Sequence, residues 1–187
     1  MPTNTNKRIA SLDALRGLAI LLMILDHILA VTGELQILRF TVTRFSMPLF
    51  FLVSGFLLYR VNIPRLVIVG LIGIALPMYV GFIDEPNVLF LYAVFAPFIV
   101  WARNSPLALM GISAFGLAMY ANNFLDLPGA YAPFALFGLM ALGKLVPRES
   151  WERVRLPRFL NYAGRYPLTT YVVHLLVLET FTRLGLP

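Results

Sequence analysis

The chain alternates long apolar stretches with short polar connectors along its whole length. Seven apolar segments stand out, and they cover residues 9–31, 37–59, 66–83, 88–102, 107–121, 129–146 and 162–181. A helix needs about 20 mostly apolar residues to cross a bilayer, so each segment predicts a spanning helix, with the fourth and fifth segments short by that standard. The connectors, such as RVNIPR and RNSP, are rich in turn-forming residues. The pattern therefore predicts an all-α, polytopic membrane helix bundle of about seven helices, in a single domain 1–187.

Composition favours the same class. The 187 residues are 59% hydrophobic and 13% charged, with a mean hydropathy of +0.81. A soluble domain of this length could not bury so much apolar surface, which favours an integral membrane protein. The chain has no cysteine, which excludes disulfides and thiol nucleophiles, and its two histidines make a poor metal-binding set. We therefore predict no metal.

Lysine and arginine are concentrated in alternate connectors. The N-terminal tail, residues 1–8, and the long segment 144–160 are basic, whereas the connectors that fall on the opposite side hold few lysines and arginines. Cytoplasmic loops of membrane proteins carry such an excess, so we predict a multi-pass protein of the cell membrane with a cytoplasmic N-terminus and an outer C-terminus. Attraction to anionic inner-leaflet lipids explains the basic segment. The net charge of +6 then needs no nucleic-acid partner.

The first apolar segment contains four ionisable residues: Asp13, Arg16, Asp26 and His27. Such residues usually face a bundle interior or a wet cavity, because a charge at a helix centre costs about 2.5–3.5 kcal/mol. Arg16 and His27 are eleven residues apart, so they share one helix face at a separation of about 16 Å. Asp13 is placed to pair with Arg16, whereas Asp26 points away from His27. The face suits a cavity that holds an anion at Arg16 and moves a proton at His27, although a snorkelling arginine and a packing histidine fit it too.

Three stretches resemble known families. SLDALRGLAILLMILDH resembles the first transmembrane helix of acyltransferase-3 proteins and of the related heparan-α-glucosaminide N-acetyltransferase family, and MILDHI resembles the F-pilin acetylase family. PLFFLVSGFLL, residues 48–58, is similar to the second helix of the acyltransferase-3 pattern. GRYPLTTYVVHLLVL, residues 164–178, is similar to the closing helix of these families. The resemblance implies transfer of an acyl group, by expectation acetyl, from cytosolic acyl-coenzyme A to a hydroxyl or amine acceptor, which is a sugar, a lipid or a peptide.

The resemblance also implies roles for individual residues. His27 would be the general base, or would carry the acyl group itself, and Arg16 would hold the coenzyme phosphates or position the thioester. Relatives have more spanning helices, and they carry basic residues before the proline of the third helix, where this chain has IGIAL, residues 72–76. Arg60 and Arg65 are therefore candidate substitutes for coenzyme binding, or a second subunit completes the cavity in a homodimer.

The remaining candidates are polar residues in or beside other spans. His174 and Tyr171 lie near each other in the last segment, and Arg165 at its start could line the coenzyme entrance. Arg44 is either an anchor at the outer interface or a cavity group. Together with Asp13, Asp26 and Arg44, the pair His174 and Tyr171 makes up the candidate acceptor-binding set.

Two other readings stay open on sequence alone. Ionisable residues within spans also mark ion or proton routes, so a small transporter or channel is one alternative. A non-catalytic relic of the acyltransferase fold is the other. Ser54 and Gly55 in VSGF do not match a nucleophile elbow and instead favour close packing between helices.

Overall fold

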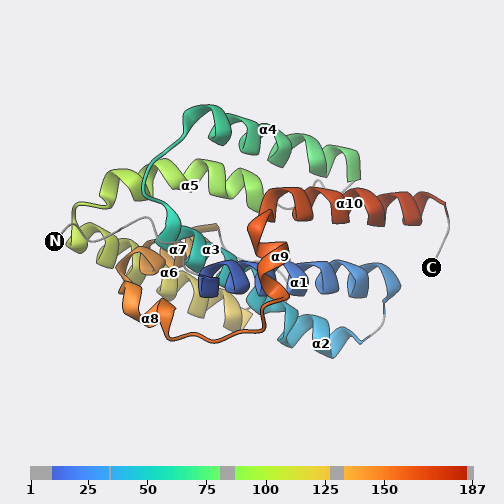
Figure 1. Ribbon diagram of the computed structural model, residues 1–187, viewed down its shortest axis with the longest axis horizontal. Coiled ribbons are helices and arrows are strands. Elements are labelled where there is room, and N and C mark those ends of the chain that lie inside the picture. Colours follow the sequence, from blue (N-terminus) through green and yellow to red (C-terminus); the bar gives the residue numbers. More distant parts are fainter. Residues whose placement is uncertain (1–9, 34, 81–86, 127–132, 185–187) are drawn as a thin grey trace.

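The computed structural model describes residues 10–33, 35–80, 87–126 and 133–184, and within these ranges every regular element is a helix. The predicted all-α class is therefore confirmed. The elements are α1 (Ala10–Thr32), α2 (Gln36–Thr41), η1 (Thr43–Phe45), α3 (Ser46–Leu57), α4 (Ile63–Val80), α5 (Val88–Ala102), α6 (Pro106–Asp126), α7 (Pro133–Leu145), α8 (Arg148–Glu152), α9 (Leu160–Arg165) and α10 (Pro167–Arg183). In Figure 1, α1 runs beside α10 in the same direction, and α9 crosses over α1.

Three predicted segments match single helices closely, and one helix is longer than predicted. The segment 88–102 coincides with α5, and 9–31 differs from α1 by one residue at each end. The segment 66–83 corresponds to α4, although residues 81–83 lie outside the described part. Helix α6 has 21 residues and so extends well past the predicted 107–121. The start of 129–146 also lies outside the described residues, and its remainder forms α7.

Two predicted segments are divided into shorter helices. The segment 37–59 is divided into α2, η1 and α3. Pro48 lies in the first turn of α3, where a backbone N–H has no partner within the helix. The segment 162–181 is divided into α9 and α10 at Tyr166, whose φ of −126° and ψ of 61° are not helical. A residue that precedes proline is kept out of the helical region by steric contact, and Pro167 follows Tyr166. The prediction of one continuous helix is wrong in both places.

The basic segment 144–160 contains a short helix that is attached to the start of α1. Trp151 in α8 is buried, and its ring lies 5.5 Å from that of Phe56, centroid to centroid. It belongs to a small apolar cluster with Leu12 and Leu15 of α1. The Ser11 hydroxyl donates to the carbonyl of Trp151 over 2.6 Å. The segment is therefore packed against the bundle rather than being a simple loop.

Glycines allow α3 and α7 to approach each other closely. A Cβ atom added to Gly55 would lie 1.8 Å from the carbonyl oxygen of Met140, and one added to Gly143 would lie 1.8 Å from that of Leu52. Any side chain at either position would push the two backbones apart. The close packing expected of Gly55 is confirmed, and it resembles the small-residue contacts of membrane helices.

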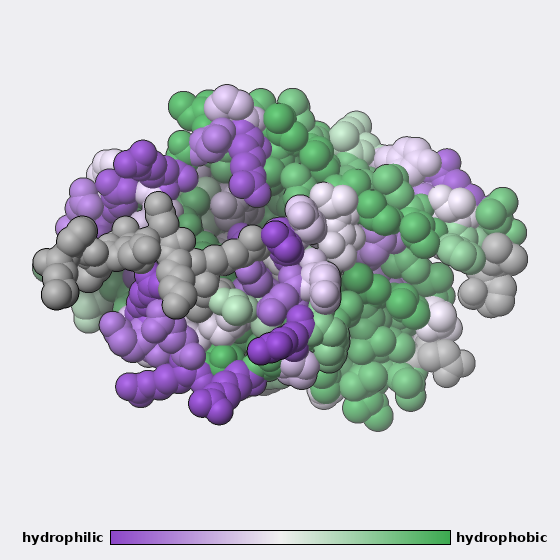
Figure 2. All heavy atoms as spheres, in the orientation of Figure 1, coloured by the Kyte–Doolittle hydropathy of each residue, from purple (hydrophilic) through white to green (hydrophobic). Residues whose placement is uncertain are grey.

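The two ends of the bundle differ in character. At one end the Lys144 ammonium donates to the carbonyl of Leu58 over 2.9 Å, and Arg103 donates to that of Tyr59 over 2.6 Å. The ends of α3, α5 and α7 therefore meet there, and Figure 2 shows hydrophilic residues gathered at the same end, over α8. At the other end Arg183 of α10 donates to the carbonyl of Tyr79 of α4. Hydrophobic residues cover the surface over α4 and α2.

One helix in the described part of the chain, α1, is long and apolar enough to cross a membrane by length and composition. Five further apolar helices are shorter than this criterion requires: they fall within α3, α4, α5, α6 and α7. The seven-span topology and the orientation of the termini stay predictions.

Candidate active site

A cavity of about 370 Å³ opens between α1, α3, α4, α5 and the start of α10. Its volume falls in the range typical of small-molecule sites. Three of its lining residues are arginines: Arg16, Arg60 and Arg65. The structure thus brings together three of the four arginines that the sequence proposes for coenzyme binding. Close cations raise the local potential and favour an anionic ligand.

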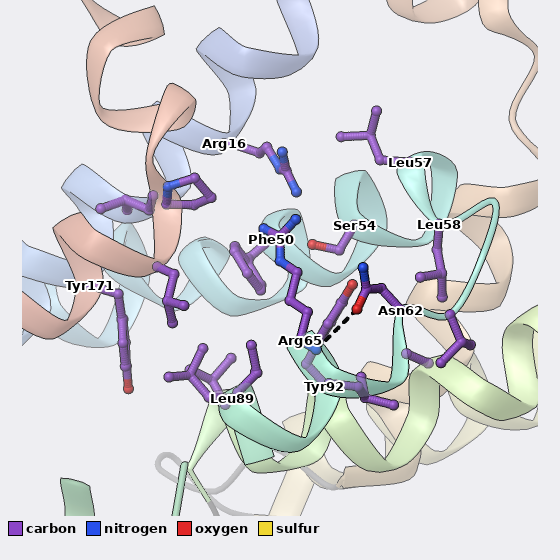
Figure 3. A pocket seen from close by; sticks show the side chains of 18 of the residues that line it. Arg16, Phe50, Ser54, Leu57, Leu58, Asn62, Arg65, Leu89, Tyr92 and Tyr171 are labelled. Atoms are coloured by element: carbon purple, nitrogen blue, oxygen red, sulfur yellow. Dashed lines mark hydrogen bonds between the residues drawn. The ribbon is translucent and has the colours of Figure 1, made fainter. Parts of the chain in front are cut away.

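The arginines come from separate elements that the sequence places at one end of the bundle. Arg16 lies on α1, Arg60 follows α3, and Arg65 lies in the first turn of α4. Asn62 starts α4 by accepting from the backbone N–H of Arg65 over 3.1 Å. Figure 3 shows the side chains of Arg16 and Arg65 extending toward each other across the cavity. An anion between them would be reached from both sides.

Ser54 adds a hydroxyl to the same cavity from α3. The residue is 2% exposed, and its Oγ has no hydrogen-bond partner among the described residues. A buried hydroxyl without a partner costs free energy, so a ligand that bonds to it recovers that cost. The sequence pattern predicted only a packing role for Ser54, and its neighbour Gly55 fills that role.

The cavity ends at Met23 of α1 and Tyr171 of α10. The amide of Asn87, at the N-cap of α5, donates to the Tyr171 hydroxyl over 3.1 Å and fixes the phenol. The Tyr171 ring lies 5.3 Å from the His174 ring in an edge-on arrangement. One further turn along each helix therefore leads from the cavity to a histidine: from Met23 to His27 and from Tyr171 to His174.

The two histidines of the chain form a pair. His27 Nδ1 lies 2.9 Å from His174 Nε2, and the rings are stacked at 16° with centroids 5.2 Å apart. The Nδ1 atom of His174 lies 3.1 Å from the carbonyl oxygen of Thr170. Both histidines were candidate site residues from the sequence, but no local pattern links two residues that are 147 positions apart.

Asp26 contacts other residues than His27, its neighbour in the chain. Its carboxylate accepts from the Thr43 hydroxyl over 2.6 Å and lies 3.8 Å from Arg39 Nε. These contacts join the end of α1 to α2 and η1, in line with the prediction that Asp26 points away from His27. Arg39 and Thr43 were missed as partners. Their spacing of four residues, which puts them on one helical face, was the available signal.

The other candidates lie outside the cavity lining. Asp13 is in the first turn of α1, where its carbonyl contacts Gly164 of α9. Arg165 ends α9, is exposed and lies 5.9 Å from the centre of the Tyr166 ring. Arg44 lies in η1, and its side chain is outside the described residues.

A second, shallower depression of about 490 Å³ lies between α1 and α10. Its lining is mostly apolar and includes Ile24 and Ile28 of α1. Its polar residues are Thr169, Thr170 and His174. His174 thus borders the apolar depression, and the basic cavity ends about one helical turn from each histidine.

Among the described residues, no three histidine or acidic side chains are grouped as a metal site would require. A family model described as an acyltransferase domain matches residues 9–101, about half of the chain. The match contains most of the cavity lining, including all three arginines. It also contains α1 with His27. Neither a curated protein nor a solved structure matches the chain.

Proposed function

The chain belongs to the acyltransferase-3 family, with acyl transfer as its general chemistry, and from this premise we propose a membrane-bound enzyme that uses acyl-coenzyme A. The acyl group, by expectation acetyl, moves from cytosolic acyl-coenzyme A to the hydroxyl or amine of a sugar, lipid or peptide. The cavity with Arg16, Arg60 and Arg65 carries this proposal, because the donor is a polyanion. Arginine binds phosphate through a planar, permanently charged fork.

The extended shape of the donor fits the distance between the arginines and the histidine pair. Arg16 and His27 are eleven residues apart on α1, which corresponds to about 16 Å along the axis. Phosphates held by the arginines leave the pantetheine arm to run along the cavity toward Met23 and Tyr171. The thioester then lies beside His27, which acts as the base toward the acceptor.

A lipid environment is supported by the surface of α4. Val67, Leu71, Ile74 and Met78 recur at helical spacing, and each is at least half exposed. Soluble proteins rarely expose a contiguous apolar face of this kind. Contact with lipid makes such a face favourable. The multi-pass arrangement in the cell membrane, with the basic end in the cytoplasm, is part of this proposal.

The test is acetyl-coenzyme A binding and thiol release by the purified protein in detergent. The chain has no cysteine, so a thiol reagent reports only the coenzyme released. We expect binding, slow release of thiol without acceptor, and faster release with an acceptor panel. Loss of thiol release in His27→Ala, with binding kept, supports the role of the base.

The arginines are tested by Arg65→Gln beside Arg158→Gln, an exposed arginine that does not line the cavity. Hydrogen bonds to charged groups contribute about 1.5–3 kcal/mol, so Arg65→Gln should weaken donor binding about 10-fold to 100-fold. Arg158→Gln should leave binding unchanged. A folded protein that does not bind acetyl-coenzyme A overturns the proposal. Equal effects of the two substitutions overturn the role of the cavity.

A further inference from the structure

The histidine pair has a feature that the proposed acyl transfer does not by itself explain. Three hydrogen-bonding groups are linked one after another: the Thr170 carbonyl, the His174 imidazole and the His27 imidazole. Each contact is of hydrogen-bond length, at 3.1 Å and 2.9 Å. The carbonyl at the end of the row can only accept, and this fixes the direction of every bond.

The protons follow in order from the carbonyl. His174 Nδ1 must carry a proton to donate to Thr170. A neutral imidazole has one N–H, so His174 Nε2 is then an acceptor, and His27 Nδ1 must carry the proton between the two rings. His27 Nε2 is left with a free lone pair. We infer that His174 is a positioning residue that holds His27 in the tautomer whose Nε2 is the base.

The other charged and polar groups near His27 have partners of their own, so His174 is the group that orients it. Asp26 lies on α1 one residue before His27, but its carboxylate accepts from the Thr43 hydroxyl and faces Arg39. Tyr171, on the element that carries His174, is held by Asn87. A neutral imidazole therefore fills the place that a carboxylate holds in a catalytic triad. It orients the base without placing another anion in an apolar segment, where a charge is costly.

The inference deepens the proposed function and rests on it for its catalytic consequence. In the reaction, His27 Nε2 takes the proton of the acceptor hydroxyl or amine as that oxygen or nitrogen attacks the thioester carbonyl. The carbon–sulfur bond breaks, and the coenzyme thiolate takes the proton back from the imidazolium. The products are the acylated acceptor and free coenzyme thiol, and His27 returns to its starting tautomer.

The tautomer can be measured without any substrate. The chain has two histidines, so protein labelled with ¹⁵N-histidine has four ring nitrogens to assign, by comparison with His27→Ala and His174→Gln. At neutral pH we expect both Nδ1 atoms protonated and both Nε2 atoms unprotonated. Protonated Nε2 on His27 overturns the inference. This measurement decides the tautomer even if the protein acylates no acceptor. Failure of the inference can therefore be distinguished from failure of the proposed function.

The catalytic consequence is tested with two substitutions of the same residue. His174→Phe keeps a ring but removes the acceptor, whereas His174→Gln keeps an oxygen that can accept from His27. We expect His174→Phe to lower kcat about 100-fold with an unchanged KM for acetyl-coenzyme A, since the arginines that hold the donor are distant. His174→Gln should recover most of the loss, and Val173→Ala, an exposed neighbour, should behave as wild type.

Two results would contradict the positioning role. One is a His174→Phe enzyme with wild-type kcat. The other is a His27 tautomer that stays the same after His174→Phe in the ¹⁵N spectrum. If the phenylalanine variant does not fold, the wild-type spectrum and the comparison of His174→Gln with Val173→Ala still decide the inference, because a glutamine variant with His27 protonated on Nε2 contradicts it.

Discussion

Replacing Gly164 by alanine should both loosen the bundle and disturb the histidine pair. A Cβ atom at this position would lie 1.7 Å from the carbonyl oxygen of Asp13, whereas ordinary contacts begin at 3.4 Å. The difference, 3.4 minus 1.7, means that α9 must move about 1.7 Å away from α1. Overpacking of this kind costs about 1–3 kcal/mol, which corresponds to a factor of about 5 to 150 in the unfolding equilibrium.

The displacement should reach the site because α10 begins two residues after α9 ends. Movement of α9 carries the start of α10 with it and lengthens the 2.9 Å contact between His174 and His27. We therefore expect Gly164→Ala to release coenzyme thiol more slowly than wild type while still binding acetyl-coenzyme A.

The assay is unfolding by sodium dodecyl sulfate in mixed micelles, followed by far-ultraviolet circular dichroism and by the fluorescence of the two tryptophans, the buried Trp151 and the exposed Trp101. The matched control is Gly111→Ala in α6, where an added Cβ meets no atom within 4 Å. The control should be more stable than wild type by about 0.5–1 kcal/mol, the usual gain from glycine to alanine in a helix. If Gly164→Ala unfolds at the same detergent fraction as Gly111→Ala, then α9 does not pack on α1 as described.

Two further substitutions test single hydroxyl groups. Ser54→Ala should leave stability unchanged or slightly higher, because it removes a buried hydroxyl without a described partner, yet it should weaken acetyl-coenzyme A binding about 5-fold. Its control is Ser113→Ala, whose buried hydroxyl donates to Leu109 outside the cavity, and equal donor affinity in the two variants would contradict a ligand role for Ser54. Thr43→Val should destabilise the protein by about 1–3 kcal/mol in the same unfolding assay, because Asp26 loses its donor. Asp26→Asn keeps an acceptor and should cost less, so the reverse order would refute the proposed tie between α1 and η1.

Hydropathy predicted a helix well where local sequence signals, such as a capping residue or a polar stretch, stand at both of its ends. Helix α5 starts after Asn87, whose side chain accepts from the N–H of Leu89, and it stops before the polar stretch RNSP. Both signals are local, so the boundaries could be predicted. The prediction for segment 37–59 was wrong because apolar character alone does not reveal the division into α2, η1 and α3.

The site was predictable in its parts but not in its assembly. Arg16 and His27 share a face of one helix, and helical periodicity is enough to recognise that. Arg60 and Arg65 come near Arg16 only because α3 packs beside α1 and α4 packs on α5 and α10, and no local pattern encodes those contacts. The same holds for His174, which meets His27 through the packing of α10 on α1. Contacts between distant segments depend on side-chain packing that periodicity does not describe.

The hydrogen bond between His27 and His174 also determines how early during synthesis of the chain the site can form. The two residues are 147 positions apart, and chains are synthesised at about 5–20 residues per second. His27 is therefore made about 7 to 30 seconds before its partner, at these rates. During that interval the nascent chain can already hold the arginines of α1 and α4 but has no oriented imidazole. The contact thus makes completion of α10 a precondition for a working base.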